Sequence, residues 1–181
     1  MKIILGFCLS LLFITSCKKE LSPEYGITND RVGKLTRTTL INELESIYAQ
    51  DSLVKESTSK ALGGQSGKIE VYEKGGEHLL SITPNTDSIA KIGNVRIHDP
   101  RFTTQEGIGM LSTFKDIKAH FTIKKVVTSL NNVVVFLKDS DLYFTISKEE
   151  LPADLRFGNT NIDVVQIPDQ AKIKYMMVGW D

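Results

Sequence analysis

Apolar residues recur at helical spacing in two segments of the chain. In the first segment, the shared helix face is formed by Leu40, Ile41, Leu44, Ile47 and Tyr48. In the second, it is formed by Phe114, Ile117 and Phe121. Thr38-Thr39 precedes the first segment, and Thr113 with Asp116 three residues later approximates a capping box at the second. The pattern therefore predicts two helices that each begin at a hydroxyl cap.

Runs of alternating polar and apolar residues follow each predicted helix. In the first half they span residues 68–73, 78–83 and 89–98, and the segment Lys74-Gly75-Gly76-Glu77 between the first two is a hairpin signal. In the second half they span residues 133–138, 142–147 and 172–180. The predicted order is therefore one helix and three strands, twice.

This order predicts an α+β fold of two pseudo-repeated αβββ units with antiparallel sheets. Repeat 1 spans about residues 31–100 and repeat 2 about residues 106–181. A helix and a small sheet each have one face to bury, so we expect each sheet to be covered by its helix and the units to share a core or a sheet edge. Gly33 and Gly109, before the two helices, predict turns with positive φ or close backbone approach.

Two other segments of the second half have distinct compositions. Residues 148–170 form an insertion with Pro152 and Pro168, and their length makes them the candidate functional loop. Residues 176–180 are apolar on both faces, which is typical of a central buried strand. An exposed binding groove lined by Trp180 and the methionines is the alternative.

The first 16 residues have the organisation of a secretory signal. Lys2 supplies the basic start, residues 3–14 contain no charge, and Thr15-Ser16 are the small residues before a cleavage site. A membrane-spanning helix needs roughly 20 apolar residues, and this run ends at Lys18-Lys19. We therefore predict that the signal peptide, residues 1–16, is removed.

The segment Ile14-Thr15-Ser16-Cys17 resembles the lipobox of bacterial lipoproteins. The resemblance implies cleavage before Cys17, a lipid on its sulfur, and stable anchoring of the mature chain to a membrane. In lipoproteins of two-membrane bacteria, an Asp after the lipidated cysteine is the inner-membrane retention signal. Lys18 at that position favours the outer membrane. Residues 17–30 are then the lipidated cysteine and a tether, and residues 31–181 are the soluble domain.

Composition excludes several classes of partner and chemistry. The 181 residues include 22 basic and 22 acidic side chains, so the chain has no electrostatic footprint for nucleic acid. Its two cysteines are Cys8, in the predicted signal, and Cys17, at the predicted lipid site. A folded domain without thiols has no disulfide, no thiolate nucleophile and no cysteine metal site.

The histidines of the chain are His78, His98 and His120. If neighbouring strands bring His78 and His98 together, Asp99 is the third candidate ligand of a metal site. No two histidines have a fixed ligand spacing such as i, i+4, and the alternative is that each is a partly exposed structural residue. Asp99 and Arg101 predict a turn between the units, in which Arg101 pairs with a nearby carboxylate.

Motifs of catalysis are missing from the sequence. It has no Gly-x-Ser-x-Gly elbow, the loop at residues 139–141 lacks the glycine of a calcium loop, and Gly33-Lys34 lacks the Ser or Thr of a phosphate loop. We therefore predict no catalytic residue, no cofactor and no metal, and a protein that is not an enzyme.

A small set of residues accompanies the order of predicted elements: Gly33, Gly107, Ile108, Gly109, Ser112, Thr113, Phe114, Leu151, Pro152 and Trp180. With that order, they resemble the enterobacterial sigma-E-regulated lipoprotein family, whose molecular function is unassigned. The opening of the second helix is similar, more remotely, to tandem-repeat envelope modules such as the outer-membrane-assembly lipoprotein BamE and the β-lactamase-inhibitor protein. Proteins of that second group bind proteins and catalyse nothing, and the resemblance implies a binding role here.

The sequence supports two functional hypotheses. The first is a non-catalytic, outer-membrane-anchored lipoprotein that binds another envelope protein or maintains the envelope under stress. The alternative is a protein that binds a small ligand or metal ion in the cleft between the two repeats, with His78, His98 and Asp99 as candidate ligands.

Overall fold

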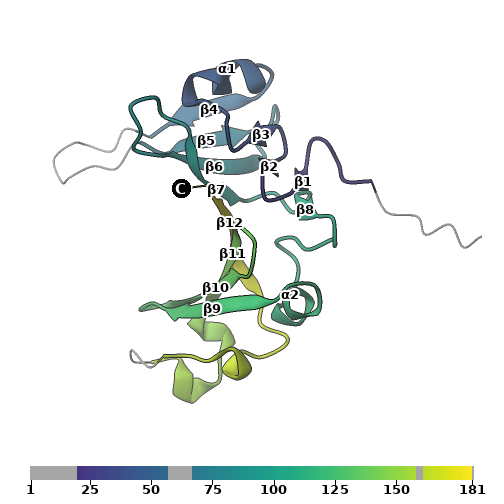
Figure 1. The fold of residues 1–181 in the computed structure, drawn as a ribbon, viewed down its shortest axis with the longest axis vertical. Helices are drawn as coiled ribbons and strands as arrows, with labels where there is room; N and C mark the ends of the chain where they lie inside the picture. The colour runs from purple at the N-terminus through teal and green to yellow at the C-terminus, as the bar shows by residue number, and fades with distance from the viewer. Residues whose placement is uncertain (1–19, 57–66, 158–160, 181) are drawn as a thin grey trace, which may run out of the picture.

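The structure is a computed structural model that describes residues 20–56, 67–157 and 161–180. It consists mainly of strands (Figure 1). Eight strands form one antiparallel sheet in the order β4-β5-β6-β7-β12-β11-β10-β9. Their bounds are β4 (Ser52–Lys55), β5 (Ile69–Tyr72), β6 (His78–Pro84), β7 (Ile92–Ile97), β9 (Ile123–Thr128), β10 (Asn132–Leu137), β11 (Leu142–Ser147) and β12 (Ile173–Gly179). β7 and β12, the last strands of the two halves, therefore pair in the middle of the sheet.

All six strands that the sequence predicts are present, and all belong to this one sheet. The two edge strands of the sheet, β4 and β9, are not predicted from the sequence. Each half therefore contributes four strands instead of three. The mixed α+β class is confirmed, but the strands of the two halves are joined in one sheet.

A smaller sheet lies beside the large one (Figure 1). It has four short strands in the order β3-β2-β1-β8, with bounds β1 (Gly26–Ile27), β2 (Arg31–Val32), β3 (Leu35–Thr36) and β8 (Thr103–Thr104). β1 pairs antiparallel with β2 and parallel with β8. The last residues of the predicted tether are thus part of the fold, because both residues of β1 are buried.

Of the two predicted helices, the second is the longer. α2 (Phe114–His120) begins at Thr113, whose hydroxyl accepts a hydrogen bond from the backbone N–H of Asp116. The Asp116 carboxylate accepts in return from the Thr113 backbone N–H at 2.7 Å, so the predicted capping box is confirmed.

No helix in the described part of the chain has the length and apolar character needed to cross a membrane.

The first predicted helix is a 3-10 turn, η1 (Ile41–Glu43), followed by the single turn of α1 (Leu44–Ile47). Leu40 has extended backbone and forms a bridge with Lys91, so the helix cannot begin there. Leu44 is the one residue of α1 that is buried. The expectation that each set of strands is covered by a helix of its own is therefore not confirmed.

The insertion at residues 148–170 contains three 3-10 turns among its described residues: η3 (Lys148–Glu150), η4 (Ala153–Leu155) and η5 (Val164–Gln166). It packs onto the second half of the sheet, because the Ile162 backbone N–H donates to the Thr128 hydroxyl at 3.0 Å. Leu151, Ile162 and Ile167 are buried in the core. The segment thus contributes to the core in addition to any role as a loop.

One face of the large sheet supplies the core. Its central row, in which each residue is the registered partner of the next, is Leu53, Val71, Leu80, Ile97, Met176, Phe144, Val135 and Val126. The six inner members of this row are fully buried. In Figure 1 the small sheet and α2 lie on this side, and they bring buried residues such as Phe102 and Phe114 to it. Trp180 is buried with them, and its indole N–H donates to the Asn29 carbonyl at 2.7 Å.

The two glycines before the predicted helices have the predicted geometries. Gly33 has a φ of +56°, and a Cβ there would lie 2.5 Å from the Glu24 carbonyl oxygen. Gly109 is a close approach, because its Cβ would lie 2.8 Å from the Phe102 carbonyl oxygen. Any other residue at either position would force the backbone apart.

Candidate functional site

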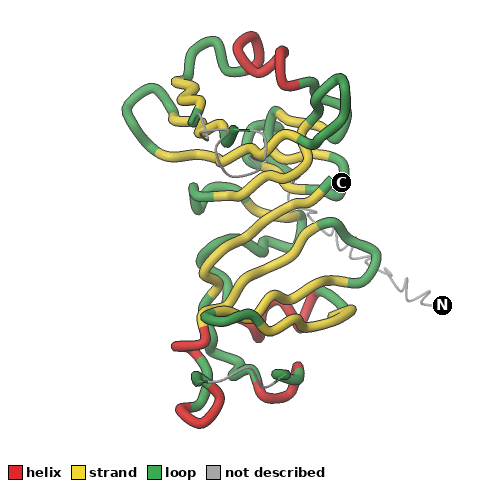
Figure 2. The backbone as a smooth tube through the Cα atoms, turned by 90° about the vertical axis from the view of Figure 1, so that its left-hand side faces the viewer, coloured by secondary structure: helices red, strands yellow, loops and turns green. Residues whose placement is uncertain are grey.

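The opposite face of the large sheet points away from the core, and we call it the open face. Its central row, again one residue from each strand in register, is Val54, Glu70, Ser81, Arg96, Met177, Tyr143, Phe136 and Lys125. In Figure 2 the open face is toward the viewer, and α2 and the small sheet lie behind the strands. Four neighbouring members of the row, from Arg96 to Phe136, are half-buried. Along the central row from β7 to β10, this face therefore presents large side chains without the cover that the core face has.

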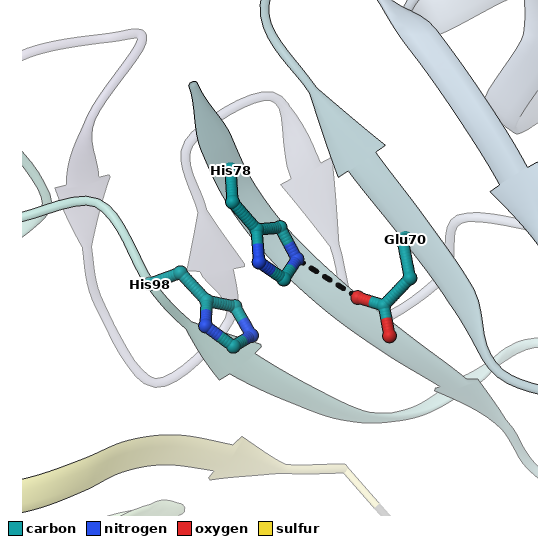
Figure 3. Close-up of side chains that lie close together, drawn as sticks. All are labelled: Glu70, His78 and His98. Carbon is teal, nitrogen blue, oxygen red and sulfur yellow. Dashed lines mark hydrogen bonds and ion pairs between the residues drawn. The ribbon is translucent and has the colours of Figure 1, made fainter. Parts of the chain in front are cut away.

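Three polar side chains gather at the β5–β7 end of the open face (Figure 3). They are Glu70 of β5, His78 of β6 and His98, the residue after β7. Their possible metal-ligand atoms all lie within 4.8 Å of one another. The two imidazole rings stack with centroids 3.7 Å apart and planes at 17°, and Tyr72 stacks on His78 at 4.5 Å. The structure thus brings together the two histidines that the sequence singled out.

A β-bulge places His78 on the open face. Val71 pairs with Leu80 and Tyr72 pairs with His78, so Leu79 is an extra residue in β6. In a regular strand, His78 and Ser81 are three residues apart and would point to opposite faces. The bulge turns His78 to the side of Ser81, and both side chains reach Glu70.

A chain of hydrogen bonds joins these side chains. Ser81 Oγ donates to Glu70 Oε2 at 2.6 Å, and His78 Nε2 lies 2.8 Å from the same oxygen. His98 Nε2 lies 2.6 Å from Ser81 Oγ, and it is the donor there because the serine proton is directed at Glu70. Lys68 forms an ion pair with the other oxygen, Oε1, of Glu70. The carboxylate is therefore held from both sides, and the residue is only 4% exposed.

Burial and these bonds set the charges of the cluster. Burial by itself raises the pKa of the Glu70 carboxyl, but hydrogen bonds from Lys68, Ser81 and His78 outweigh it and hold the pKa below its usual value. Burial, followed by the nearby His78 and Arg96, lowers the pKa of His98 to about 4. At neutral pH the cluster therefore contains a carboxylate and a neutral His98 ring.

Asp99 lies outside this cluster. Its carboxylate accepts hydrogen bonds of 2.6–3.0 Å from Arg101, which also binds Glu73 at 2.9 Å. The Arg101 hydrogen bonds hold the pKa of Asp99 below its ordinary value, and the predicted pairing of Arg101 with a local carboxylate is confirmed. The third histidine, His120, is exposed at the end of α2, where its Nδ1 lies 3.0 Å from the Asp116 carbonyl oxygen.

Glu70 lies beside the two histidines, where the sequence had suggested Asp99, and it was not predicted from the sequence. Its position in a predicted strand, opposite the predicted strand with Ser81, was the available signal. Register alone would have paired Glu70 with Ser81, but it would not have revealed the bulge that adds His78.

Cationic groups lie over aromatic rings along the rest of the open face. The pairs, with distances to the ring centroid, are Arg96 over Tyr175 at 3.5 Å, Lys174 over Tyr175 at 5.3 Å and Lys125 over Phe136 at 4.9 Å. Within the described residues, the buried Nε–H of Arg96 has no hydrogen-bond acceptor. Aromatic and Arg side chains are enriched at the centres of protein interfaces. The aromatic and Arg side chains of the open face are thus of the types that are enriched at protein interfaces.

A separate hollow of about 260 Å³ lies between the small sheet and the turn that joins β10 to β11. Its lining includes Asn29, Thr104, Phe121 and Lys138. The Asn29 amide donates to the Asp139 carbonyl at 3.2 Å beside it. Neither the two clustered histidines nor Asp99 line this hollow, so a ligand there would not use the candidate residues of the sequence.

The predicted signal peptide and Cys17 lie outside the described residues. Cleavage, lipidation and location at the outer membrane therefore stay predictions from the sequence.

Comparison with known proteins shows the fold. No protein-family model and no curated protein matches the chain. Among solved structures, the chain is similar to the crystal structure of the uncharacterized protein yfeY from Escherichia coli, with a TM-score of 0.53 and 16% sequence identity. The likeness covers 85% of this chain and 99% of that chain. At 16% identity this likeness shows the fold alone.

Proposed function

We propose that the chain is a non-catalytic, lipid-anchored protein of the bacterial envelope, at the outer membrane, whose open face binds another envelope protein. The observation that carries the proposal is the row of half-buried cationic, apolar and aromatic side chains, Arg96, Met177, Tyr143 and Phe136, across the four strands β7, β12, β11 and β10. Burying such a surface against a second protein lowers the free energy, because aromatic and apolar side chains are removed from water. On the core face of the same sheet, by contrast, the six inner side chains of the central row are fully buried.

The cationic side chains of the open face favour an acidic partner. Arg96, Lys125 and Lys174 are the cations of this face that lie over rings, whereas the carboxylate of Glu70 is already neutralised by Lys68. A partner carboxylate would pair with the exposed ammonium groups of Lys125 and Lys174. Charge-assisted bonds of this kind are about twice as strong as neutral ones, and complementary charge also speeds association.

The polar cluster favours binding over hydrolysis. Ser81 carries the hydroxyl nearest to a histidine, but it is 2% exposed and its oxygen is bonded on both sides. A nucleophile has to reach its substrate and pass its proton to a base. Ser81 donates a hydrogen bond to a carboxylate and is buried, so no substrate can reach it, which suits a structural role.

The anchor is a separate part of the proposal, supported by the lipobox. Replacing Cys17→Ala should move the chain from the membrane fraction to the soluble fraction of the envelope, because the acyl chains supply the membrane affinity. If the Cys17→Ala chain sediments with membranes as the parent chain does, the anchor assignment is wrong.

The binding face is tested with a photo-crosslinking residue placed at Met177, in the middle of the open face. A matched chain carries it at Lys115, an exposed position on α2. We expect one envelope protein to be captured at Met177 and not at Lys115. Lys125→Glu with Lys174→Glu should weaken that crosslink, because an acidic partner is then repelled, whereas Lys115→Glu should leave it unchanged.

The open face is not the binding surface if the Met177 crosslink survives the double charge reversal at full strength. The same conclusion holds if both positions capture the same proteins, or if neither captures any in cells that express the anchored chain.

We also propose that the two halves of the chain, about residues 31–100 and 106–181, arose by duplication. The sheet order supports this, because each half supplies four strands and the two sets meet through β7 and β12. A relative with a single set of four strands that dimerises through the strand matching β7 would support the proposal. A relative in which one set has no counterpart of β4 or β9 would count against it.

A further inference from the structure

We propose that Glu70, His78 and His98 bind a divalent metal ion of the late first transition row, with Zn²⁺ as the test ion. Two imidazoles and one carboxylate suit zinc, copper, nickel and iron(II), whereas Mg²⁺ and Ca²⁺ prefer oxygen ligands. The site lies on the open face, but it does not depend on the protein-binding role proposed above.

The sheet brings the three ligands together. Adjacent strands β5, β6 and β7 position them, and their candidate ligand atoms already lie within 4.8 Å of one another (Figure 3). Zinc ligands at about 2.0–2.2 Å from the ion lie roughly 3.2–3.5 Å from each other in a tetrahedral site. The side chains therefore have to close by about 1.5 Å or less, which rotation about side-chain bonds supplies while the strands stay in place.

The two imidazole rings have to change their relative orientation when the ion binds. Each ring directs its ligand lone pair within its own plane, and the stacked planes lie at only 17° to each other. One ring must therefore turn out of the stack to share an ion with the other. His78 has room to turn, because its side chain is 29% exposed, and in turning it also leaves the Tyr72 ring on which it stacks.

Neighbouring side chains orient the carboxylate. Ser81 donates to Glu70 Oε2 at 2.6 Å, and this hydroxyl remains in place to hold the oxygen when the histidines turn to the ion. Partners of this kind fix ligand orientation in metal sites and tune their affinity. The site has three protein ligands and reaches solvent on the side of His78, so the fourth position is left for water or an exchangeable ligand.

Lys68 opposes the ion. Its ammonium occupies Glu70 Oε1 and would be repelled by a divalent cation at the same carboxylate. The Lys68 side chain is 38% exposed and can swing into water. The residue therefore competes with the metal ion and sets how tightly the site binds it.

The test is a calorimetric titration of the purified full-length chain, stripped of metal by a chelator, with Zn²⁺ and, as a negative probe, Ca²⁺. We expect one Zn²⁺ per chain at this site and no response to Ca²⁺. His78→Asn and His98→Asn should each weaken the binding by about tenfold or more. His120→Asn removes an exposed histidine outside the cluster and should leave it unchanged. All these chains keep the same cysteines, so any contribution from thiols cancels in the comparison.

Lys68→Gln gives a result of opposite sign. Removing the competing ammonium should tighten Zn²⁺ binding by roughly threefold to tenfold at low ionic strength, and salt should reduce the gain. A merely structural role of Lys68 would not increase the affinity.

The proposal is overturned if the parent chain binds no Zn²⁺, or if the three histidine variants bind it alike. A thermal unfolding curve for each variant establishes that it is folded. Should His98→Asn fail to fold, His78→Asn and Lys68→Gln decide the question, because both residues are partly exposed.

Discussion

Asn94 and Tyr143 are joined across the central strand of the large sheet, where the Asn94 amide nitrogen donates to the Tyr143 hydroxyl at 2.6 Å. Asn94 belongs to β7 and Tyr143 to β11, and β12 runs between them. Gly179 of β12 pairs with Asn94, and a Cβ there would lie 3.4 Å from the Tyr143 ring and 3.5 Å from the Asn94 amide. The bond therefore links the two sets of four strands above a residue that has no side chain of its own.

Tyr143→Phe should lower the free energy of unfolding by roughly 0.5–1.5 kcal/mol, because it removes this hydrogen bond and leaves the ring. Urea denaturation measures the change. Tyr175→Phe is the matched control, since Tyr175 is half-buried on the same face and its hydroxyl has no hydrogen-bond partner among the described residues. The control should change stability by less than about 0.5 kcal/mol, and equal losses in both variants would show that the Asn94 bond stabilises nothing.

Gly33→Ala should destabilise the fold by about 2–4 kcal/mol. Its φ of +56° costs about 1 kcal/mol for a residue with a Cβ, and the clash with the Glu24 carbonyl oxygen adds to that. Gly107→Ala separates the two effects, because Gly107 has a φ of +80° and open space around its Cβ position. Denaturation midpoints should show a loss near 1 kcal/mol for Gly107→Ala. A loss of the same size at Gly33 would mean that the chain relaxes around the new methyl group.

The ion pairs of Arg101 should make stability depend on pH at the acid end. Arg101 hydrogen bonds hold the pKa of Asp99 below its ordinary 3.8 and that of Glu73 below its ordinary 4.5. Because the folded pKa values are the lower ones, the stabilisation is complete above the unfolded values and is lost as the pH falls through the folded ones. Through the pair with Asp99, Arg101→Met should therefore cost about 1 kcal/mol at pH 7, discounted for exposure, and less near pH 2.

Urea unfolding of parent and variant at both pH values checks this expectation. Arg156→Met is the control, because Arg156 donates to the Leu151 backbone carbonyl at 2.7 Å, an acceptor that does not titrate. Its cost should be the same at the two pH values. If the cost of Arg101→Met is equally insensitive to pH, then packing over the Tyr25 ring, 4.4 Å away, is what Arg101 contributes.

Thr113→Ala should cost about 1 kcal/mol by removing the hydroxyl half of the α2 capping box. The backbone N–H of Asp116 loses its acceptor, while the Asp116 carboxylate keeps its bond from the Thr113 backbone. Thr122→Ala, at an exposed position after the helix, is the control and should be near neutral. Thermal unfolding of the two variants decides between a capping contribution and none.

The inner strands of the sheet are predictable from sequence and the edge strands are not, for a physical reason. Inner strands alternate because one face packs into the core, as at β10, where Val133, Val135 and Leu137 are buried. Edge strands are shorter or carry charge, which blocks pairing with other chains. β4 is four residues long and has no buried residue, and β9 contains Lys124 and Lys125 in succession. Neither has the alternation from which strands are predicted.

The cluster on the open face is only partly predictable, because it depends on a single extra residue. The sequence supplies two histidines on neighbouring predicted strands, and their proximity follows from pairing. Strict alternation, however, would direct His78 and Ser81 to opposite faces. The bulge at Leu79 results from how the β5–β6 hairpin closes and from packing of both Leu79 and Leu80 in the core. Neither local propensity nor spacing contains that information.

The position of β12 also fixes the order in which the sheet can be completed during synthesis. The ribosome makes this strand after the seven others of the sheet, yet both β7 and β11 pair with it. Until residues 173–179 have been synthesised, no strand of the set β4–β7 pairs with a strand of the set β9–β11. Long-range pairing of this kind closes slowly, and both incomplete sheets meanwhile present unpaired strand edges, the species that chaperones protect from aggregation. We therefore expect a chain with this topology to remain unfolded and bound to chaperones until β12 has been synthesised.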